Sequence, residues 1–374
     1  MASITFYPLG NADSYRIDLE SGKTLLFDYA DMRCADDPQD KRIDLPTALR
    51  KDLAAAGRSS YDVVAFTHFH DDHVCGASSF FELRHAAKYQ GSGRIGIAEM
   101  WVPAFAITEV KDDLCEDGKI LQEEARYRLI QGSGIRVFSR PAKLEAWLKS
   151  KGLSLASRQN LITDAGQPVP EWSKERDGVE FFVHSPFASR QNDGSLIDSN
   201  SNSLVLQATF LSGGQATRVL LMGDTEYECL SEIVRISRYH GREDRLEWDL
   251  AKLPHHSSYA SLGPEKGTER TVPVPNVAWL YEEQGQIGSR IISTSDRIPS
   301  SGEAPQPPHR QAANYYRAAA KGRSGEYLVT MEHPTVAKPE PLVVKIDGFG
   351  ASVAKASLPI GGAAIGTSAP RAGA

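Results

Sequence analysis

The sequence predicts an α+β fold, with strands and helices mixed along one large domain. Three apolar runs separated by turn residues, at 4–9, 15–19 and 24–30, are typical of a β-meander. Farther along, segments with apolar residues at helical spacing alternate with more strand-like runs. The 374 residues exceed the usual length of one domain, but layered α/β domains reach this size, so we expect one decorated domain.

The later elements are predicted in chain order. Apolar residues at helical spacing predict helices at 45–56, 73–83, 121–130, 142–148, 225–239 and 308–321. Apolar runs that end at turn residues predict strands at 94–103, 135–138, 179–186, 204–211, 217–222, 248–253, 290–294 and 342–346, the first of which is expected to enter a loop. Polar stretches indicate loops at 154–177 and 190–202, and the Ala/Gly/Ser/Pro-rich end from about residue 358 is predicted to be disordered.

The composition excludes several classes of protein. No segment approaches the roughly 20 continuous apolar residues of a membrane span. The first residues, MASITFY, lack the basic and apolar parts of a secretory signal, so we predict a cytoplasmic protein without membrane contact. The four cysteines form no Cys-x-x-Cys pair, which argues against a disulfide framework and a structural zinc ribbon. A net charge of −6 gives no overall electrostatic footprint for nucleic acid.

The segment THFHDDH at 67–73, directly after an apolar strand-like run, predicts a metal site. Imidazole nitrogens and carboxylate oxygens are ligands that zinc prefers and that manganese and iron accept. Side chains alternate along an extended segment, so His68 and His70 point the same way and can bind one ion. Where the chain turns into a helix, Asp72 and His73 can reach a second ion, which would make a two-metal site.

This motif resembles the signature of the metallo-β-lactamase fold superfamily, whose members hydrolyse esters, amides, thioesters and phosphodiesters with one or two metals. The resemblance implies a four-layer αββα sandwich, in which two mixed β-sheets are flanked by helices. It implies a hydrolase domain at 1–335 with an insertion at about 104–177, followed by a C-terminal strand and tail at 336–374.

The resemblance also implies further site residues at the ends of other strands. Asp224 follows Gly223 at a strand end, where the superfamily places a carboxylate that bridges both metals. Asp28 ends the third strand and is expected to orient metal ligands as a hydrogen-bond acceptor. Asn202 stands where the superfamily usually has another histidine ligand, and His184, one strand earlier, is the alternative.

The segment LPHHSS at 253–258 narrows the resemblance. Together with NSNS and LLMGD before it, this segment is similar to the branch typified by the hydrolase domain of the DNA-uptake protein ComEC. We expect His256 to bind metal and His255 to contact substrate or donate a proton, although the two roles could be reversed. That branch usually has His-His-Gly-Ser, so Ser257 departs from its pattern; Ser257 and Ser258 are assigned to substrate binding.

These features predict a metal-dependent phosphodiesterase, most simply a nuclease acting on DNA, with two divalent ions, Zn²⁺ or Mn²⁺. Asp72 and His255 are the expected catalytic residues, and the helix at 308–321 carries Arg310 and Arg317, which can contact phosphates. A hydrolase of a small ester, lactone, thioester or cyclic nucleotide is the alternative and fits the acidic net charge better. A non-catalytic scaffold is a third alternative, against which the retained ligands argue.

Overall fold

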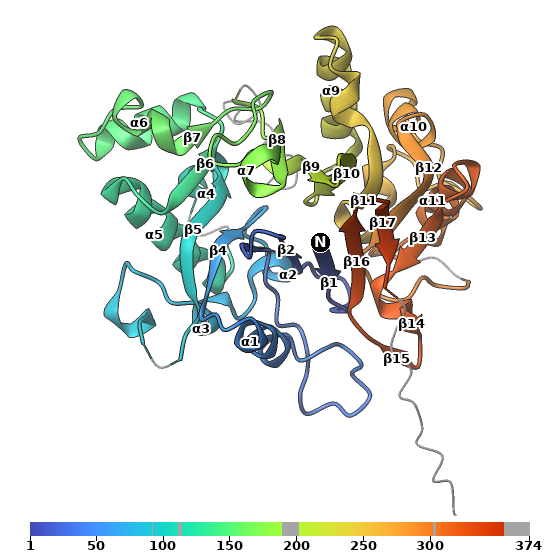
Figure 1. Ribbon diagram of the computed structural model, residues 1–374, viewed down its shortest axis with the longest axis horizontal. Helices are drawn as coiled ribbons and strands as arrows, with labels where there is room; N and C mark the ends of the chain where they lie inside the picture. The colour runs from blue at the N-terminus through green and yellow to red at the C-terminus, as the bar shows by residue number, and fades with distance from the viewer. Residues whose placement is uncertain (92, 111–113, 189–201, 302–303, 355–374) are drawn as a thin grey trace, which may run out of the picture.

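Two mixed β-sheets form the centre of the computed structural model, which describes residues 1–91, 93–110, 114–188, 202–301 and 304–354 (Figure 1). In order across the first sheet, the strands are β17 (Gly350–Val353), β16 (Leu342–Asp347), β1 (Ala2–Phe6), β2 (Tyr15–Asp18), β3 (Thr24–Phe27), β4 (Ser60–Ala65), β5 (Gly96–Pro103), β6 (Ile135–Phe138) and β7 (Ile162–Thr163). The second sheet contains β13 (Glu326–Val329), β12 (Gly285–Ser293), β11 (Trp248–Lys252), β10 (Gln215–Met222), β9 (Val205–Ser212) and β8 (Val179–Ser185).

Each sheet has an antiparallel part and a parallel part. In the first sheet, the strands from β17 to β3 pair antiparallel and those from β3 to β7 pair parallel. In the second sheet, β8, β9 and β10 pair antiparallel, whereas β10 to β13 pair parallel. Because the carboxyl ends of parallel strands meet at one edge, the loops after β3 and β4 lie together, and so do those after β10 and β11.

Three apolar layers hold the sheets and helices together. Apolar residues from both sheets fill the space between them, and the T-shaped ring contact of Trp101 in the first sheet with Phe181 in the second joins the sheets across it. The outer face of the first sheet packs against α1 (Leu45–Ala55), α3 (Ala77–Phe80), α4 (Ala104–Thr108), α5 (Glu116–Gln131) and α6 (Ala142–Ser150). The outer face of the second packs against α9 (Tyr227–Tyr239), α10 (Pro275–Glu282) and α11 (Arg310–Gly322).

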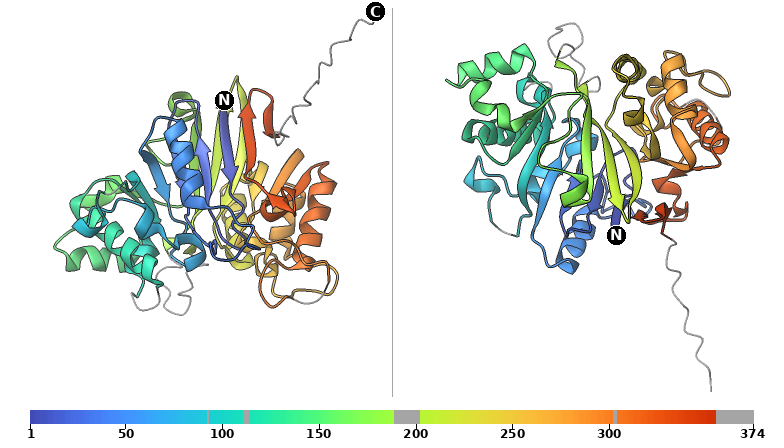
Figure 2. Two further views of the ribbon diagram at one scale, coloured as in Figure 1. Left: turned by 90° about the horizontal axis from the view of Figure 1, so that it is seen from below. Right: turned by 45° about the horizontal axis from the view of Figure 1, so that its top comes forward.

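The helices therefore lie outside two stacked sheets, with the green helices on one side and the yellow to orange helices on the other (Figure 2). This arrangement confirms the predicted αββα sandwich. The predicted strands all overlap strands of the structure. None of the helices in the described ranges is long and apolar enough to cross a membrane.

Three predicted elements differ from the structure. The helix expected at 73–83 is wrong: the chain forms two four-residue helices, α2 (Asp71–Val74) and α3. Cys75 is extended (ψ 124°) and Gly76 is left-handed (φ 80°), so the backbone hydrogen-bond ladder cannot continue through them. The strand at 94–103 leads into α4 and not into a loop. The expected loop at 154–177 contains the short strand β7 and α7 (Lys174–Asp177).

The segments expected outside the central fold extend the first sheet. Within 104–177, β6 and β7 add two parallel strands beyond β5. The C-terminal strand β16 pairs antiparallel with β1, from Ala2 opposite Ile346 to Phe6 opposite Leu342. The polar loop predicted at 190–202 lies, apart from its last residue, outside the described residues, and so does the tail expected from about 358.

Candidate metal centre

Asp28 fixes the start of the histidine-rich loop that follows β4. Its two carboxylate oxygens accept hydrogen bonds from the backbone nitrogen and the hydroxyl of Thr67, both at 2.7 Å. Oδ2 also lies 2.9 Å from Nδ1 of His73. Asp28 is fully buried and has a left-handed backbone (φ 53°), which carries the chain from β3 into the site. One carboxylate thus joins the end of β3 to both ends of the loop at 67–73.

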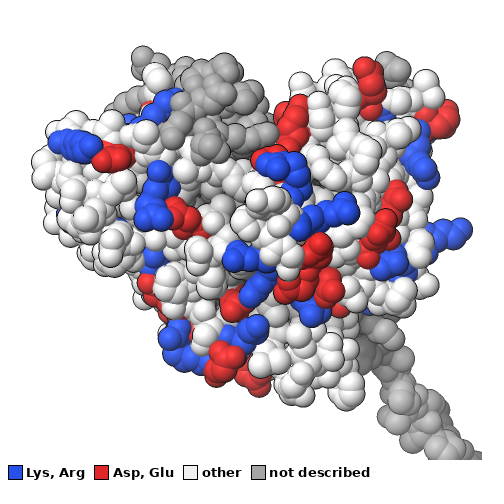
Figure 3. Space-filling view, turned by 90° about the horizontal axis from the view of Figure 1, so that it is seen from above, with Lys and Arg blue, Asp and Glu red and all other residues white. Residues whose placement is uncertain are grey.

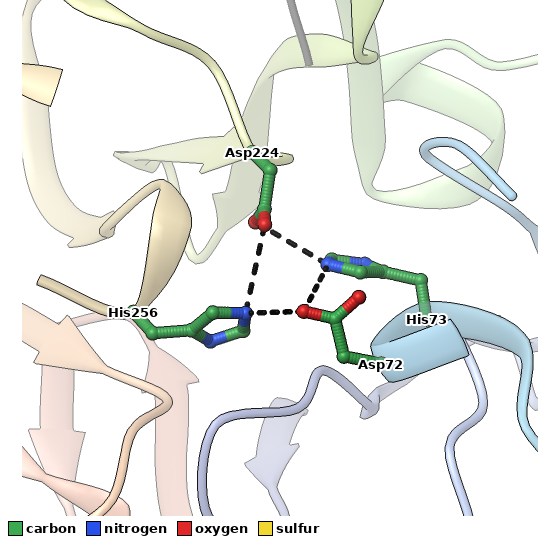
Figure 4. A group of neighbouring side chains, drawn as sticks. All are labelled: Asp72, His73, Asp224 and His256. Carbon is green, nitrogen blue, oxygen red and sulfur yellow. Dashed lines mark hydrogen bonds and ion pairs between the residues drawn. The ribbon is translucent and has the colours of Figure 1, made fainter. Parts of the chain in front are cut away.

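Four side chains from three segments converge in the centre of the site (Figure 4). Asp72 and His73 come from α2, Asp224 follows β10, and His256 follows β11. One ligand atom from each lies within 4.8 Å of all the others. His256 Nε2 is 3.2 Å from Asp72 Oδ2 and 3.6 Å from Asp224 Oδ2, and His73 Nε2 is 3.3 Å from Asp224 Oδ1. Two imidazole and two carboxylate donors around one point form a set that a divalent ion accepts.

A second group, formed by His68, His70 and Asp72, adjoins the first. Its ligand atoms also lie within 4.8 Å of one another, and the rings of the two histidines are 4.6 Å apart. His68 Nε2 is buried and has no hydrogen-bond partner among the described residues, although Nδ1 lies 3.1 Å from Thr67 Oγ1 and 3.3 Å from Ser203 Oγ. A buried nitrogen without a partner costs free energy, and a metal ion would satisfy it. Asp72 belongs to both groups.

Hydrogen bonds orient the histidines so that Nε2 faces the centre. His256 Nδ1 donates to the carbonyl of Thr294 at 2.7 Å, and His73 Nδ1 pairs with Asp28. Because a carbonyl only accepts, the proton of neutral His256 is on Nδ1 and the lone pair of Nε2 points at Asp72 and Asp224. Such partners fix the tautomer and orientation of metal-binding histidines.

The electrostatics of the centre favour bound positive charge. Burial lowers the pKa of His68 well below its usual value, which keeps this imidazole in the neutral form that binds metals. Burial alone would raise the pKa of Asp224, but the charges of His73 and His256 outweigh it and hold that pKa well below the usual range. Burial opposes the protonation of His256, yet Asp224 and Asp72 raise its pKa to about 9. A divalent ion would supply the positive charge that these protons provide.

The loop that carries His256 is conformationally strained. Three consecutive residues have positive φ: His255 at 48°, His256 at 51° and Ser257 at 63°. Residues other than glycine seldom adopt this conformation. Ser257 Oγ lies 2.8 Å from Ser293 Oγ and 2.9 Å from the hydroxyl of Tyr327, and the backbone nitrogen of His255 donates to Asp224 Oδ1. Packed, hydrogen-bonded neighbours therefore hold this backbone in place.

Asn202, His184 and Ser258 were also predicted as site residues. Asn202 is buried, and two residues later Leu204 donates its backbone N–H to the carbonyl of Thr67, which starts the histidine-rich loop. His184 is apart from both groups: its Nε2 hydrogen-bonds the carbonyl of Arg245, and burial lowers its pKa to about 4. Ser258 caps the short turn that follows, through a hydrogen bond from Ala260.

A buried ion pair beneath the centre was not predicted from the sequence. The Lys252 ammonium, at the end of β11, contacts the Asp13 carboxylate and also donates to the Met222 carbonyl at 2.9 Å. Both charged side chains are fully buried. Asp13 donates its backbone N–H to the carbonyl of Asp72 at 3.0 Å, so the pair reaches a candidate ligand. A lysine inside an apolar strand was the only sequence signal of this pair.

Comparisons with known proteins give weak similarities. The chain matches no protein-family model and no curated protein. Its structure is similar to unliganded yeast PDE1 (11% identity, 88% of this chain and 98% of the other, TM-score 0.40) and to a diphosphatase of the PhnP family (11%, 78% and 86%, 0.33). It is also similar to the metallo-β-lactamase SMB-1 (13%, 66% and 78%, 0.25). At these identities and TM-scores, the similarities assign no role to the residues of the site.

Proposed function

We propose that this chain is a metal-dependent hydrolase that acts on a phosphodiester. The observation that carries the proposal is the pair of adjoining donor groups that share Asp72, one of which contains the buried, unpartnered Nε2 of His68. His68, His70 and Asp72 would hold one ion, and Asp72, His73, Asp224 and His256 a second. When bound, divalent metal supplies an activated water and a Lewis acid for the scissile phosphoryl group.

The residues of the chain would prepare the site for that chemistry. Asp28 and the carbonyl of Thr294 hold His73 and His256 with Nε2 directed inward. Asp72 would orient the nucleophile, because it is common to both groups. His255 lies beside Asp224, but burial lowers the pKa of His255 and so works against the protonated form that a general acid needs. We therefore propose that His255 serves mainly to contact the substrate.

The substrate class is proposed from the sequence motifs. The NSNS, LLMGD and LPHHSS segments resemble the ComEC-type branch, which favours a phosphodiester and, as the most specific case, DNA. A small phosphodiester such as a cyclic nucleotide is the second candidate, because the net charge is −6. On the face drawn in Figure 3, basic and acidic side chains are interspersed, so that face offers no broad basic surface for a duplex.

The test is hydrolysis of bis-p-nitrophenyl phosphate and of linear and circular DNA. The protein is stripped of metal with a chelator and resupplied with Zn²⁺ or Mn²⁺. Asp72→Ala should abolish turnover, since it removes a ligand from both groups, whereas Asp71→Ala serves as a matched control. Asp71 is the adjacent, exposed carboxylate and belongs to neither group.

Each outcome has a distinct meaning. Metal-dependent cleavage of DNA that Asp72→Ala abolishes supports the nuclease. Cleavage of the small diester alone supports a phosphodiesterase with a smaller substrate. Cleavage of neither, by protein that retains its metal, refutes phosphodiester hydrolysis and turns attention to lactones and thioesters. Equal losses in the Asp71 and Asp72 variants would contradict the assignment of the two groups.

A further inference from the structure

We infer that a cavity beside α11 is a binding subsite for a second phosphate group of the substrate. This inference rests on the proposed function and deepens it. The cavity has a volume of about 380 Å³ and lies between the first half of α11 and the segments at 297–300 and 332–336. Its charged lining residues are Arg297, Arg310, Arg317 and Glu332.

The charge balance of the cavity favours an anion. Glu332 is its only acidic lining residue in the described part of the chain, and Glu332 Oε1 already accepts the backbone N–H of Ile298 at 3.0 Å. Arg297 is exposed and forms no ion pair within the described residues. Arg317 is also exposed and makes one hydrogen bond there, from Nη1 to Asn314 Oδ1 at 3.3 Å. Two guanidinium groups thus keep most of their donors available.

Arg310 adds a buried donor that lacks a partner. Its Nη1 and Nη2 are held by Glu269 Oε2 and the carbonyl of Thr268, at 3.1 and 3.3 Å. Its Nε is buried and has no acceptor among the residues that the structure describes. An unpaired buried donor is costly, so a small shift of the Arg310 side chain that let Nε meet a phosphate oxygen would be favourable. Guanidinium groups are well suited to phosphate because they offer several N–H donors in a fixed plane.

Two of these arginines connect the cavity to the loop that carries His256. The guanidinium of Arg317 lies over the ring of Tyr327, 5.3 Å from its centroid. The hydroxyl of the same tyrosine is 2.9 Å from Ser257 Oγ. Arg310 directly follows His309, whose backbone N–H donates to the carbonyl of Ser257 at 3.2 Å. The cavity is therefore linked, through Tyr327 and through His309, to the loop that carries His256.

Arg297 is connected to the same loop through its own segment of the chain. It is three residues after Thr294, the carbonyl of which holds His256 Nδ1. From Arg310 to Arg317, α11 advances seven residues, or about 10 Å at 1.5 Å per residue. A cavity of that extent, linked to the centre through Tyr327 and the loop that carries His256, suits a phosphate that is separate from the scissile one. The substrate would then carry at least two phosphates, as an oligonucleotide or as a small diphosphate.

The inference is tested first by binding. A fluorescein-labelled octathymidylate is titrated into full-length, metal-loaded protein. The protein carries Asp72→Asn, so that the strand is not cut. Binding is followed by fluorescence anisotropy over a range of salt concentrations. We expect Arg317→Gln and Arg297→Gln each to weaken binding by about fivefold and to lower the salt dependence by roughly one counterion. Arg235→Gln, which alters an exposed arginine on α9 paired with Glu232, is the matched control.

Kinetics then separate the subsite from the metal chemistry. In cleavage-competent protein, Arg317→Gln should raise the KM for octathymidylate and leave the KM for bis-p-nitrophenyl phosphate, which has one phosphate, unchanged. Inorganic pyrophosphate is then added as a competitor. If it displaces the labelled strand from the parent protein, but tenfold less well from Arg317→Gln, a small diphosphate is a ligand of the same subsite. If pyrophosphate does not compete, and the variants still bind the strand more weakly, the ligand of the subsite is the neighbouring phosphate of a nucleotide chain.

Two results would overturn the inference. In the first, the Arg297 and Arg317 variants bind the labelled strand with the same affinity as the Arg235 control. The other is an equal rise in KM for the strand and for the single-phosphate substrate, which would place the effect in the metal centre. If the parent protein hydrolyses no phosphodiester but the binding differences persist, the subsite stands and the proposed function fails.

Discussion

The side chain of Asp28 shows how one residue can organise a site without entering it. Three donors from the loop at 67–73 surround its carboxylate: the backbone N–H and hydroxyl of Thr67 and the Nδ1 of His73. Burial raises the pKa of Asp28 and thus opposes its charge, while His73 lowers that pKa in return. The position at the end of β3 is where the sequence resemblance placed an acceptor, and the structure brings that acceptor to His73.

We predict that Asp28→Asn lowers metal affinity by about 10- to 100-fold, because the amide cannot act as a charged acceptor for His73 Nδ1. Asparagine tolerates the left-handed backbone at φ 53°, so the fold should be retained. Zinc affinity is measured by competition with a chromophoric chelator, and folding by circular dichroism. Asp71→Asn is the control, and equal affinity in the two variants would contradict the role assigned to Asp28.

Ser257 combines a strained backbone with useful hydrogen bonds. At φ 63°, glycine would relieve the strain, but glycine and alanine both remove the hydroxyl that contacts Ser293 and Tyr327. We therefore predict that Ser257→Gly is more stable than Ser257→Ala by about 1 kcal/mol. Urea denaturation of the two variants isolates the backbone contribution, since the lost hydroxyl is common to both. Equal midpoints would show that the neighbouring packing relieves the strain.

At the scale of elements, Lys252 and Asp13 join the two sheets beneath the site. Lys252 ends β11 in the second sheet, and Asp13 lies between β1 and β2 in the first. The residues are 239 positions apart, and each of the two buried charges is the nearest ion-pair partner of the other. His256 is four residues after Lys252, and the loop that contains Asp13 hydrogen-bonds Asp72. The ion pair thus fixes the strand end that precedes His256 against that loop.

Lys252→Met alone should destabilise the protein by about 3–5 kcal/mol, because it removes the nearest cation from the buried Asp13 carboxylate, whose other charge partner, His73 Nδ1, lies 3.9 Å away. Adding Asp13→Asn should restore part of that loss, since the double variant buries no net charge. A double-mutant cycle measured by urea denaturation gives the coupling energy between the two residues. Additive losses would indicate that the two charges do not depend on each other.

The sequence predicted local elements well and long-range partners poorly. The strands follow from apolar runs between turn residues, and the histidine motif from its ligand chemistry. The helix at 73–83 failed because apolar spacing does not report the left-handed turn at Gly76. The partnership of Lys252 with Asp13, and that of Arg297 with the cavity beside α11, depend on contacts between distant segments. Such contacts are decided by tertiary packing and leave little trace in local sequence.

For the whole molecule, the two ends of the described chain complete one sheet. β1 and β16 pair along five residues, and the inward side chains of β16 join the apolar layer between the two sheets. Residues at 336–354 therefore add to the same core as the first residues of the chain. The continuity of that core leads us to expect that a defect in β16 weakens the entire fold.

Replacing Ile346 with alanine tests this expectation. Ile346 is fully buried opposite Ala2, so the smaller side chain should leave a cavity and cost about 2–5 kcal/mol. Lys345→Ala, at the next position and exposed, should change stability by less than about 0.5 kcal/mol. Thermal unfolding is followed by far-UV circular dichroism and by tryptophan fluorescence, which reports on all five tryptophans, among them Trp101 in β5 and Trp248 in β11. A midpoint lowered equally by both probes would mean that β16 supports both sheets, whereas an unchanged midpoint would make the C-terminal strand dispensable to the core.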